Sequence, residues 1–480
     1  MKIRPDVGLT FDDVLLAPQP SSVRSRKDVS PHTWLTPDIR LSVPIISSNM
    51  DTVTEERMAI AMAQLGGIGF LHRFMSIADQ ADCVQKVKRA ESIVVENPLT
   101  ISADASVDQA RGLMAEADVG GLVVLDAHNQ VIGMVTNRDV LFAPDGGAPL
   151  SQVMTPRNRL VVASQDETIE QARAKLFANR IEKLPLVDGE GRLTGLITAQ
   201  DIIKIQQHPD ATKDSRGRLR VGAAVGVRAD DLERAAACVN AGADLLVVDI
   251  AHGHSEHTIA MVRQLKQRFP GVPVVAGNVA VPQGVIDLAQ AGAEAIKVGV
   301  GAGSTCTTRI VTGFGVPQLT AIAECAQAAQ ALGLRIIADG GIRNSGDITK
   351  ALAAGAGSVM LGNILAGMDE SPGAPVIRNG RRYKIVRGMA SLTANVDRKK
   401  LEHSEMPIED WGDVVPEGVE AIVSYRGAAA DTLHQLVGGL RSGMSYAGAR
   451  TLEELWEKAE FIRVTPSGMR ESHPHDVELI

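Results

Sequence analysis

Apolar residues fall into short continuous runs separated by amphipathic stretches through the second half of the chain. Continuous runs, unlike alternating ones, are typical of strands buried on both faces of a parallel sheet. The intervening stretches, such as residues 230–243, carry apolar residues at helical spacing, so the pattern predicts repeated strand–helix units. The predicted strands lie within residues 221–227, 244–253, 272–279, 293–301, 335–341 and 357–365.

Two further apolar runs upstream decide between the possible sheets. Residues 43–51 and 66–74 bring the predicted strands to eight, which favours an α/β fold of the (β/α)8 TIM barrel type over a doubly wound sheet. In such a barrel, residues that follow the strands meet at one mouth, where active sites lie. The polar residues at these positions are Asp249, Asn278, Cys306, Asp339 and Asn363.

The second and third predicted strands are separated by an insert that contains an internal repeat. "GMVTNRDVLF" at 133–142 recurs as "GLITAQDIIK" at 195–204, 62 positions later. A duplicated βαββα unit of this size packs as a pair, because neither copy has enough core alone. We therefore expect a catalytic barrel in two parts, residues 1–94 and 208–480, with an inserted domain at 95–207.

The repeat resembles a tandem cystathionine-β-synthase (CBS) domain pair. In CBS pairs the Thr and Asp of a G-x-x-T-x-x-D motif contact the ribose of a nucleotide. The resemblance implies a regulatory site for adenine or guanine nucleotides at Thr136, Asp139, Thr198 and Asp201. The alternative is that these residues only cap the helices that follow them.

Composition excludes several classes of partner. The 480 residues carry a net charge of −8, so no basic field favours nucleic acid. No apolar run approaches the roughly 18 residues of a membrane span, and the N-terminus lacks a signal-peptide core. The four cysteines are widely spaced without a C-x-x-C pair, which favours reduced thiols and a cytoplasmic location.

The loop "GVGAGSTCTTR" at 299–309 is the first candidate for chemistry. Its glycines allow a close approach of backbone N–H groups to a phosphate, as do those of residues 338–347 and 359–367. Asp339, an acceptor-only side chain, suits ribose hydroxyls. From these residues alone, Cys306 is either a nucleophile beside a bound phosphate or a small buried residue in a tight turn.

Other motifs accompany this loop in a familiar order. They are "TFDDVLL" (10–16), "NMDTVTE" (49–55), "DIAHGHS" (249–255), "AGNVA" (276–280), "ADGGIRNSGDI" (338–348) and "ESHPHD" (471–476). Together they resemble the IMP dehydrogenase/GMP reductase family over nearly the whole chain, the CBS insert included. The resemblance implies an enzyme in which a cysteine attacks C2 of a purine nucleotide to form a thioimidate. NADPH or NAD carries the hydride.

The family's functional residues carry over to matching positions of this chain. Cys306 becomes the nucleophile, Thr308 the hydroxyl near C2, and Glu417 the side-chain partner of the purine and of a proton relay. The implied substrate-binding residues are Ser304, Gly341, Gly362 and Asn363 for the phosphate, Asp339 for the ribose, and Gly388 and Met389 for the purine edge. The implied cofactor residues are Asp249, Ser255 and Asn278.

The resemblance also implies a monovalent-cation site for potassium. Its ligands are the carbonyls of Gly301, Gly303 and Cys306, completed by Glu471, Ser472 and His473 of a neighbouring subunit. A site shared between subunits implies a homotetramer, and octamers formed through the CBS pair are left open.

The direction of the reaction depends on the flap at about residues 387–427. A dehydrogenase must hydrolyse the thioimidate and uses an Arg-Tyr pair on this flap, whereas a reductase releases ammonia and needs no water attack. The segment has no Arg-Tyr dipeptide, and the nearest match is Arg398-Lys399. Loss of a general base costs a factor of about 10² to 10⁴. Asn49 and Val386 also favour a reductase, whereas Leu392 and the CBS insert favour a dehydrogenase.

We therefore favour GMP reductase, which converts GMP and NADPH to IMP, ammonia and NADP. The alternative is IMP dehydrogenase, which converts IMP, NAD and water to XMP and NADH. Its base would then come from among Arg398, Lys399, Lys400, His403 and Glu405, or Thr308 with Glu417 would relay the proton instead. A remote alternative is a catalytically dead nucleotide sensor, against which the retention of Cys306, Thr308, Asp249 and Asp339 argues.

Overall fold

The chain divides into two compact units. The computed structural model describes residues 2–91, 94–95, 97–143, 145–164, 167–402, 415–474 and 477. One unit comprises Met1–Ala90, Asp210–Asp214 and Leu219–Ile480, and the other comprises Glu91–Pro209 and Ser215–Arg218. The second unit contains the segment 95–207 that the repeat pattern assigns to an insert.

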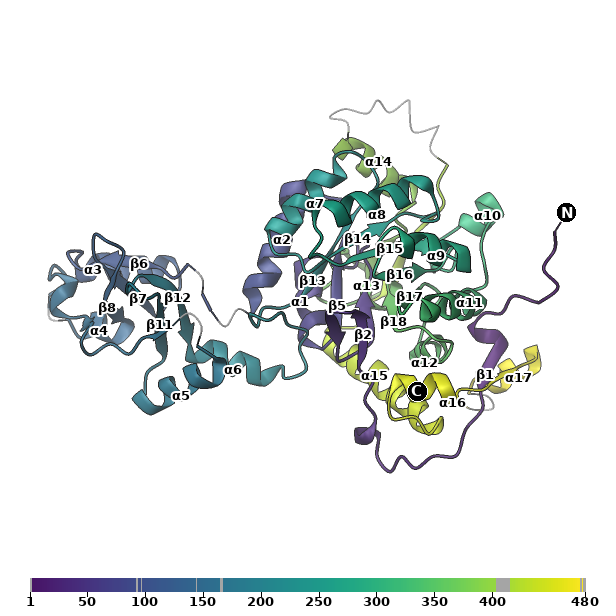
Figure 1. Ribbon diagram of the computed structural model, residues 1–480, viewed down its shortest axis with the longest axis horizontal. Coiled ribbons are helices and arrows are strands. Elements are labelled where there is room, and N and C mark those ends of the chain that lie inside the picture. Colours follow the sequence, from purple (N-terminus) through teal and green to yellow (C-terminus); the bar gives the residue numbers. More distant parts are fainter. Residues whose placement is uncertain are drawn as a thin grey trace. The chain divides into compact units, whose positions relative to one another are not determined.

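A closed barrel of eight parallel strands forms the centre of the first unit (Figure 1). The two strands from the N-terminal part of the chain close the ring, because β4 pairs with β18 and β5 pairs with β13. This confirms the predicted (β/α)8 TIM barrel. The strands are β4 (Ile45–Ser47), β5 (Ile68–Leu71), β13 (Val221–Val225), β14 (Leu245–Asp249), β15 (Val274–Val279), β16 (Ala295–Val298), β17 (Arg335–Asp339) and β18 (Ser358–Leu361).

Amphipathic helices follow the strands and cover the outside of the barrel (Figure 1). In the helix Glu256–Arg268, for example, Met261, Val262 and Leu265 are buried, and Ser255 caps the first turn. The helices of this layer are α1 (Glu56–Gln64), α2 (Ile77–Ala90), α7 (Asp231–Asn240), α8 (Glu256–Arg268), α9 (Pro282–Gln290), α11 (Gln318–Ala331), α12 (Ser345–Ala353) and α15 (Ala429–Tyr446).

The barrel interior holds a second apolar cluster, which includes Phe70, Val247 and Ile337. The hairpin of β2 (Thr33–Thr36) and β3 (Ile39–Leu41) contributes Leu35 and Leu41 to this cluster. The pattern of strand–helix units did not predict this hairpin, which precedes the first barrel strand. The apolar side chains of this cluster fill the barrel interior, so the polar side chains of the candidate site lie at the carboxyl ends of the strands.

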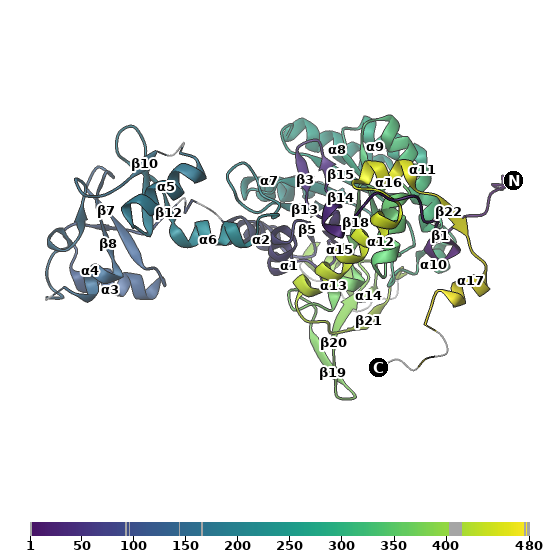
Figure 2. The same cartoon turned by 90° about the horizontal axis from the view of Figure 1, so that it is seen from below.

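Shorter elements surround the barrel (Figure 2). An antiparallel sheet of three strands projects from the barrel unit. The helix α14 (Leu392–Glu402) lies in the chain between the second and third strands of this sheet. Its strands are β19 (Pro375–Arg378), β20 (Arg381–Arg387) and β21 (Glu420–Ser424). The remaining elements of this unit are β1 (Val14–Leu16), β22 (Phe461–Arg463), α10 (Thr308–Thr312), α13 (Asn363–Ala366), α16 (Leu452–Lys458), α17 (Pro466–Glu471) and 3-10 turns at Phe11–Asp13 and Arg26–Asp28.

The second unit repeats one pairing order twice. In each copy a strand pairs in parallel with the next, which then pairs antiparallel with its successor. Val123 and Leu196, one from each copy, belong to a shared apolar cluster. The first copy has β6 (Thr100–Ser102), α3 (Val107–Glu116), β7 (Gly121–Leu125), β8 (Val131–Thr136), α4 (Asn137–Leu141), a 3-10 turn (Leu150–Gln152) and β9 (Thr155–Pro156). The second has β10 (Ala163–Ser164), α5 (Ile169–Asn179), β11 (Lys183–Val187), β12 (Leu193–Thr198) and α6 (Ala199–Gln207).

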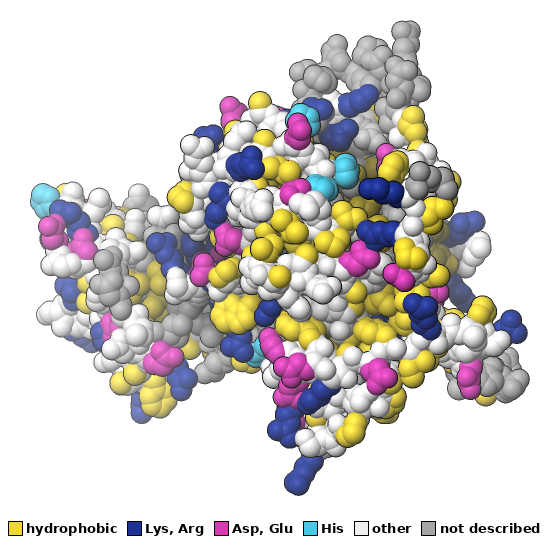
Figure 3. All heavy atoms as spheres, turned by 45° about the vertical axis from the view of Figure 1, so that its right-hand side comes forward, with side chains coloured by type: hydrophobic (Ala, Val, Ile, Leu, Met, Phe, Trp, Pro, Cys, Tyr) yellow, Lys and Arg dark blue, Asp and Glu magenta, His cyan; other side chains and the backbone are white. Residues whose placement is uncertain are grey.

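Charged side chains of both signs are interspersed over the face drawn in Figure 3. This mixture agrees with the modest net charge of −8. Among the described residues, no helix is both long and apolar enough to cross a lipid bilayer.

We expect Gly299 to be required for folding, because it follows β16 at φ +151° and a Cβ there would lie 1.9 Å from the carbonyl oxygen of Asp339. Gly299→Ala should lower the free energy of unfolding by about 2 kcal/mol or more, measured by thermal denaturation. Gly271→Ala is the control, since a Cβ at that turn meets no atom within 4 Å. Equal melting temperatures for the two variants would contradict this account of the loop.

Candidate active site

Neighbouring barrel strands end in polar groups that bond to one another. Lys297 on β16 is only 3% exposed, and its ammonium nitrogen lies 3.0 Å from Asp249 Oδ1 and also contacts Asp339 Oδ2. Asn49, which follows β4, donates from Nδ2 to Asp249 Oδ2 at 2.5 Å. Asn278 on β15 donates to Asp339 Oδ2 at 2.9 Å. The structure therefore brings Asp249, Asn278 and Asp339 together, as expected of a barrel mouth.

Burial and charge act in opposite directions on this group. Burial acts to raise the pKa of Asp249, but the ammonium of Lys297 and the hydrogen bond from Asn49 outweigh it, so the pKa lies below its usual value. Burial acts to lower the pKa of Lys297, but the carboxylates of Asp249 and Asp339 raise it above its usual value. Lys297 is therefore a fully charged ammonium at neutral pH.

Two amide side chains hold the cysteine loop beside β17. Asn278 Nδ2 donates to the carbonyl of Gly299 at 2.7 Å, in addition to its bond with Asp339. Gln318 is 2% exposed, and its Nε2 donates to the carbonyls of Val298 and Asp339 at 3.1 and 3.0 Å. These bonds fix the start of the loop relative to the predicted ribose-binding carboxylate.

Cys306 lies half-buried in this loop, and its thiol donates to Thr308 Oγ1 at 3.1 Å. The loop backbone pairs with the segment that contains Glu417. Thr307 N–H donates to the carbonyl of Glu417, and Val419 N–H donates to the carbonyl of Thr305, both at 2.9 Å. The predicted catalytic residues Cys306, Thr308 and Glu417 therefore lie on two adjacent strands of backbone.

Gly388, one of the two predicted purine-edge residues, contacts both the cysteine loop and the segment that contains Glu417. Gly388 N–H donates to the carbonyl of Val419 at 3.0 Å, and a Cβ at Gly388 would lie 3.0 Å from the carbonyl oxygen of Thr305. Met389 accepts a hydrogen bond at Sδ from Asp51 N–H at 3.4 Å. Gly388 thus packs directly against the cysteine loop, where a side chain would be crowded by the backbone of Thr305 and Gly418.

The predicted phosphate residues come from three loops. A Cβ on Gly340, which has φ +100°, would lie 3.1 Å from Gly303 N, so the loop of Gly341 packs against that of Ser304. Gly362 lies close to Met50 and Ser48, and Asn363 begins α13 with an exposed side chain. Positive φ at Gly340 and Gly341 shows that this turn requires glycine.

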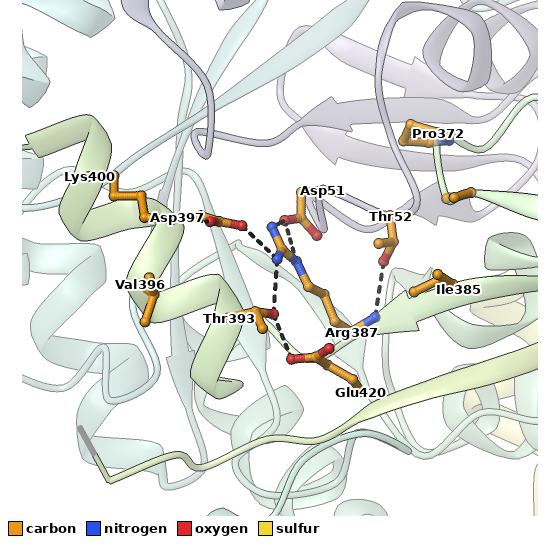
Figure 4. A pocket seen from close by; sticks show the side chains of 12 residues that line it. Asp51, Thr52, Pro372, Ile385, Arg387, Thr393, Val396, Asp397, Lys400 and Glu420 are labelled. Carbon is orange, nitrogen blue, oxygen red and sulfur yellow. Dashed lines mark hydrogen bonds and ion pairs between the residues drawn. The ribbon is translucent and has the colours of Figure 1, made fainter. Parts of the chain in front are cut away.

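Arg387 lies beside α14 and bonds to several side chains at once, a cluster that no motif predicted and that we call the Arg387 hub (Figure 4). Its Nε donates to Asp51 Oδ2 at 2.8 Å, and its Nη1 donates to Asp397 Oδ2 at 2.8 Å and Thr393 Oγ1 at 3.0 Å. Thr393 in turn donates to Glu420 at 2.6 Å. These residues line a cavity of about 510 Å³. The hub ties the helix of the flap segment to the barrel loop that follows β4.

Ser255, the remaining predicted cofactor residue, bonds to Thr258 in the first turn of α8. Ser255 Oγ caps α8 by accepting from Thr258 N–H at 3.3 Å, and lies 2.9 Å from Thr258 Oγ1. The neighbouring His254 Nε2 lies 2.7 Å from Asp287 Oδ2, which lowers the pKa of Asp287.

The residues expected at a cation site lie in two regions of the chain. The carbonyl of Gly303 accepts from Cys306 N–H at 3.1 Å, and Gly301 has φ +74°. Glu471 ends α17, and Ser472 Oγ donates to the carbonyl of Gly468 at 3.0 Å. His473 adds to the effect of Arg343 in lowering the pKa of Asp12. No group of three or more His, Cys, Asp or Glu in the described part of the chain is arranged to hold a metal ion.

In the second unit, both Thr-Asp pairs form helix caps. Asp139 Oδ2 accepts from the N–H and the hydroxyl of Thr136 at 2.8 and 2.7 Å. Asp201 Oδ2 accepts in the same way from Thr198 at 3.1 and 2.6 Å. A cavity of about 550 Å³ lies next to these pairs, lined by Arg111, Met114, Ala115, Asp118, Val119, Gly120, Asn137 and Gln200.

Comparison with known proteins places the chain in a family. The model of the IMP dehydrogenase / GMP reductase domain matches residues 8–475. The chain is 51% identical to an inosine-5'-monophosphate dehydrogenase from Nitrosopumilus maritimus, covering 98% of this chain and 99% of the relative. It is 53% identical to the enzyme of that name from Aquifex aeolicus, covering 98% and 96%.

Two solved structures that the chain matches carry the name GMP reductase, the second name of the same family. The fold matches a GMP reductase variant from Trypanosoma brucei, with a cysteine replaced by alanine, in complex with guanosine 5'-monophosphate. The TM-score is 0.89 at 45% identity, with 98% of each chain covered. The same protein in complex with guanosine 5'-triphosphate matches with a TM-score of 0.78 at 41% identity, covering 96% of this chain and 98% of that one.

The barrel shows the TIM-barrel fold, and these relatives show that the chain is an enzyme of the NAD(P)-dependent oxidoreductase class. The chain belongs to the IMP dehydrogenase / GMP reductase family.

Selective alkylation tests the exposure of Cys306. Burial raises the pKa of Cys83, Cys238 and Cys325 to about 12, with a further contribution from Glu56 at Cys83, so these thiols remain protonated near neutral pH. Iodoacetamide at pH 8 should therefore label Cys306 alone in the native protein, as read by peptide mass spectrometry. Cys306→Ser should take no label in the same interval. Comparable labelling of the three buried cysteines would contradict the assignment.

Proposed function

We propose that the chain is a GMP reductase, which converts GMP and NADPH to IMP, ammonia and NADP. One observation carries the choice within the family. The cysteine loop is paired with the Glu417 segment, yet residues 387–427 contain no Arg-Tyr dipeptide to activate water. The reversed pair, Tyr425-Arg426, supports no such role, because the Tyr425 hydroxyl donates to Asp369 at 2.7 Å.

The proposed chemistry uses the thiol and its neighbours. Cys306 Sγ bonds to C2 of GMP, and the 2-amino group leaves as ammonia after it receives a proton. Thr308 Oγ1, 3.1 Å from the sulfur, is the hydroxyl we propose for that transfer, with Glu417, whose carbonyl accepts from Thr307 N–H, as its partner. A bound nicotinamide cofactor would supply the hydride to C2, and release of IMP then requires that the C2–sulfur bond breaks and returns its electron pair to Cys306.

The proposed binding residues are those that the family resemblance implies. Asp339 accepts the ribose hydroxyls, and the loops of Ser304, Gly341, Gly362 and Asn363 offer backbone N–H groups to the phosphate. Gly388 and Met389 border the purine edge.

On the cofactor side, Asp249 and Ser255 are polar groups at the mouth, and Asn278 Oδ1 is a buried acceptor with no donor among the described residues. An acceptor of this kind fits the carboxamide N–H of a nicotinamide.

A potassium site fits the carbonyls of Gly301, Gly303 and Cys306, because backbone oxygens replace the hydration shell of such cations. We propose that Glu471, Ser472 and His473 of a neighbouring subunit complete it, which requires a homotetramer. The four cysteines are free in the structure, which supports a reducing cytoplasmic location.

IMP dehydrogenase is the second candidate, favoured by the names of the curated relatives at 51% and 53% identity. This reaction needs a base near C2. Lys399 and Lys400 lie on α14, as does Arg398, whereas His403 and Glu405 lie outside the described residues.

The direction of reaction is decided by steady-state assay of the purified protein. With GMP it should oxidise NADPH and release ammonia and IMP, because departure of ammonia needs only a proton donor. With IMP and NAD it should form little NADH. Cys306→Ser should bind GMP but show less than a few per cent of the wild-type rate. Brisk formation of XMP from IMP would assign the chain to the dehydrogenases instead.

We further propose that the second unit is a CBS pair that regulates the barrel. Its cavity is bordered by Asn137, which follows Thr136, and by Gln200, which lies between Thr198 and Asp201. The cavity thus lies next to both Thr-Asp motifs, although Thr136, Asp139, Thr198 and Asp201 are not among the residues that line it, and it supports a site for an adenine or guanine nucleotide there.

Deletion of residues 95–207 tests this regulation. The barrel should remain catalytically competent, because the insert leaves and rejoins it between β5 and β13 alone. Its rate should no longer respond to ATP or GTP, whereas the rate of the full chain should. An unchanged response in the deletion variant would refute the regulatory role.

A further inference from the structure

Lys297 connects two sides of the barrel mouth that bind different molecules in the proposed function. Its ammonium contacts Asp249 on the cofactor side and Asp339 on the ribose side. The side chain comes from β16, which pairs with β17 and is separated from β14 by β15, and it is 3% exposed. It is therefore too deep in the barrel to act as a surface ion pair.

The ammonium separates two like charges. Asp249 and Asp339 both point at Lys297, so without it two carboxylates would face each other in a partly buried place. The amides of Asn49 and Asn278 each donate to one of these carboxylates, but neutral donors do not offset the charge. The position of each carboxylate thus depends on a cation that it shares with the other.

We infer that Lys297 is a positioning residue that holds Asp339 for the nucleotide ribose and Asp249 for the cofactor at the same time. The inference rests on the proposed roles of the two aspartates but not on the direction of the reaction. IMP and GMP carry the same ribose, so both should respond alike to changes at Lys297.

The test compares a variant that loses the positive charge of Lys297 with a double variant that also loses the negative charge of Asp249. Lys297→Met should weaken binding of GMP and of IMP, measured by calorimetry without cofactor, by about tenfold or more. It should also raise KM for the cofactor. In the double variant Lys297→Met, Asp249→Asn, one carboxylate is removed with the cation. Nucleotide binding should then return to within about threefold of wild type, while KM for the cofactor stays high.

Two further variants control for packing. Lys297→Arg keeps the charge and should bind GMP more tightly than Lys297→Met. Lys266 contacts Glu294 at 2.6 Å outside the mouth, so Lys266→Met should leave both nucleotides bound as in wild type.

Two results would overturn the inference. One is a folded Lys297→Met that binds both nucleotides within about twofold of wild type. The other is a double variant that shows no recovery. If Lys297→Met does not fold, the double variant decides alone, and its failure to fold or to bind GMP counts against the inference. Binding of IMP and GMP to the variants can follow the expected pattern even if the wild-type enzyme turns over only IMP. That outcome would support this inference and reject the proposed GMP reductase activity.

Discussion

The backbone pairing of residues 305–307 with residues 417–419 is the contact on which the proposed chemistry depends. It joins a loop at the end of β16 to the far end of the flap segment, more than a hundred positions along the chain. Because Cys306 and Glu417 are held by main-chain bonds, their approach does not depend on side-chain packing. Gly388 bonds to the same segment, so the proposed nucleophile, proton relay and purine edge lie on adjoining backbone segments.

This arrangement separates what the family has in common from what distinguishes its members. In the proposed function, the cysteine loop, its glycine turns and the carboxylates at the mouth would serve either direction of the reaction at C2. The proposed choice between water and ammonia would then rest with the flap, whose helix α14 the Arg387 hub links to Asp51. Relatives of similar identity, 51% and 45%, carry the two different names.

Much of the barrel follows from the sequence, because continuous apolar runs such as 244–253 and 293–301 have few alternatives to a buried parallel strand. Lys297 interrupts one of these runs, and a charge in a buried strand signals a partner. The partners, Asp249 and Asp339, were themselves predicted, yet only the strand order β14–β15–β16–β17 places them on either side of it. Arg387 and the hairpin of Leu35 and Leu41 lie outside the strand–helix repeat and gave no comparable signal.

Isotope transfer tests the central claim most directly. GMP is incubated with NADPH that carries deuterium at the transferable C4 position, and the product is examined by mass spectrometry and proton NMR. If hydride passes to purine C2 at the Cys306 site, the IMP formed will carry deuterium at C2, and Cys306→Ser will form none. IMP without deuterium at C2, or labelled IMP formed at an undiminished rate by Cys306→Ser, would contradict the account.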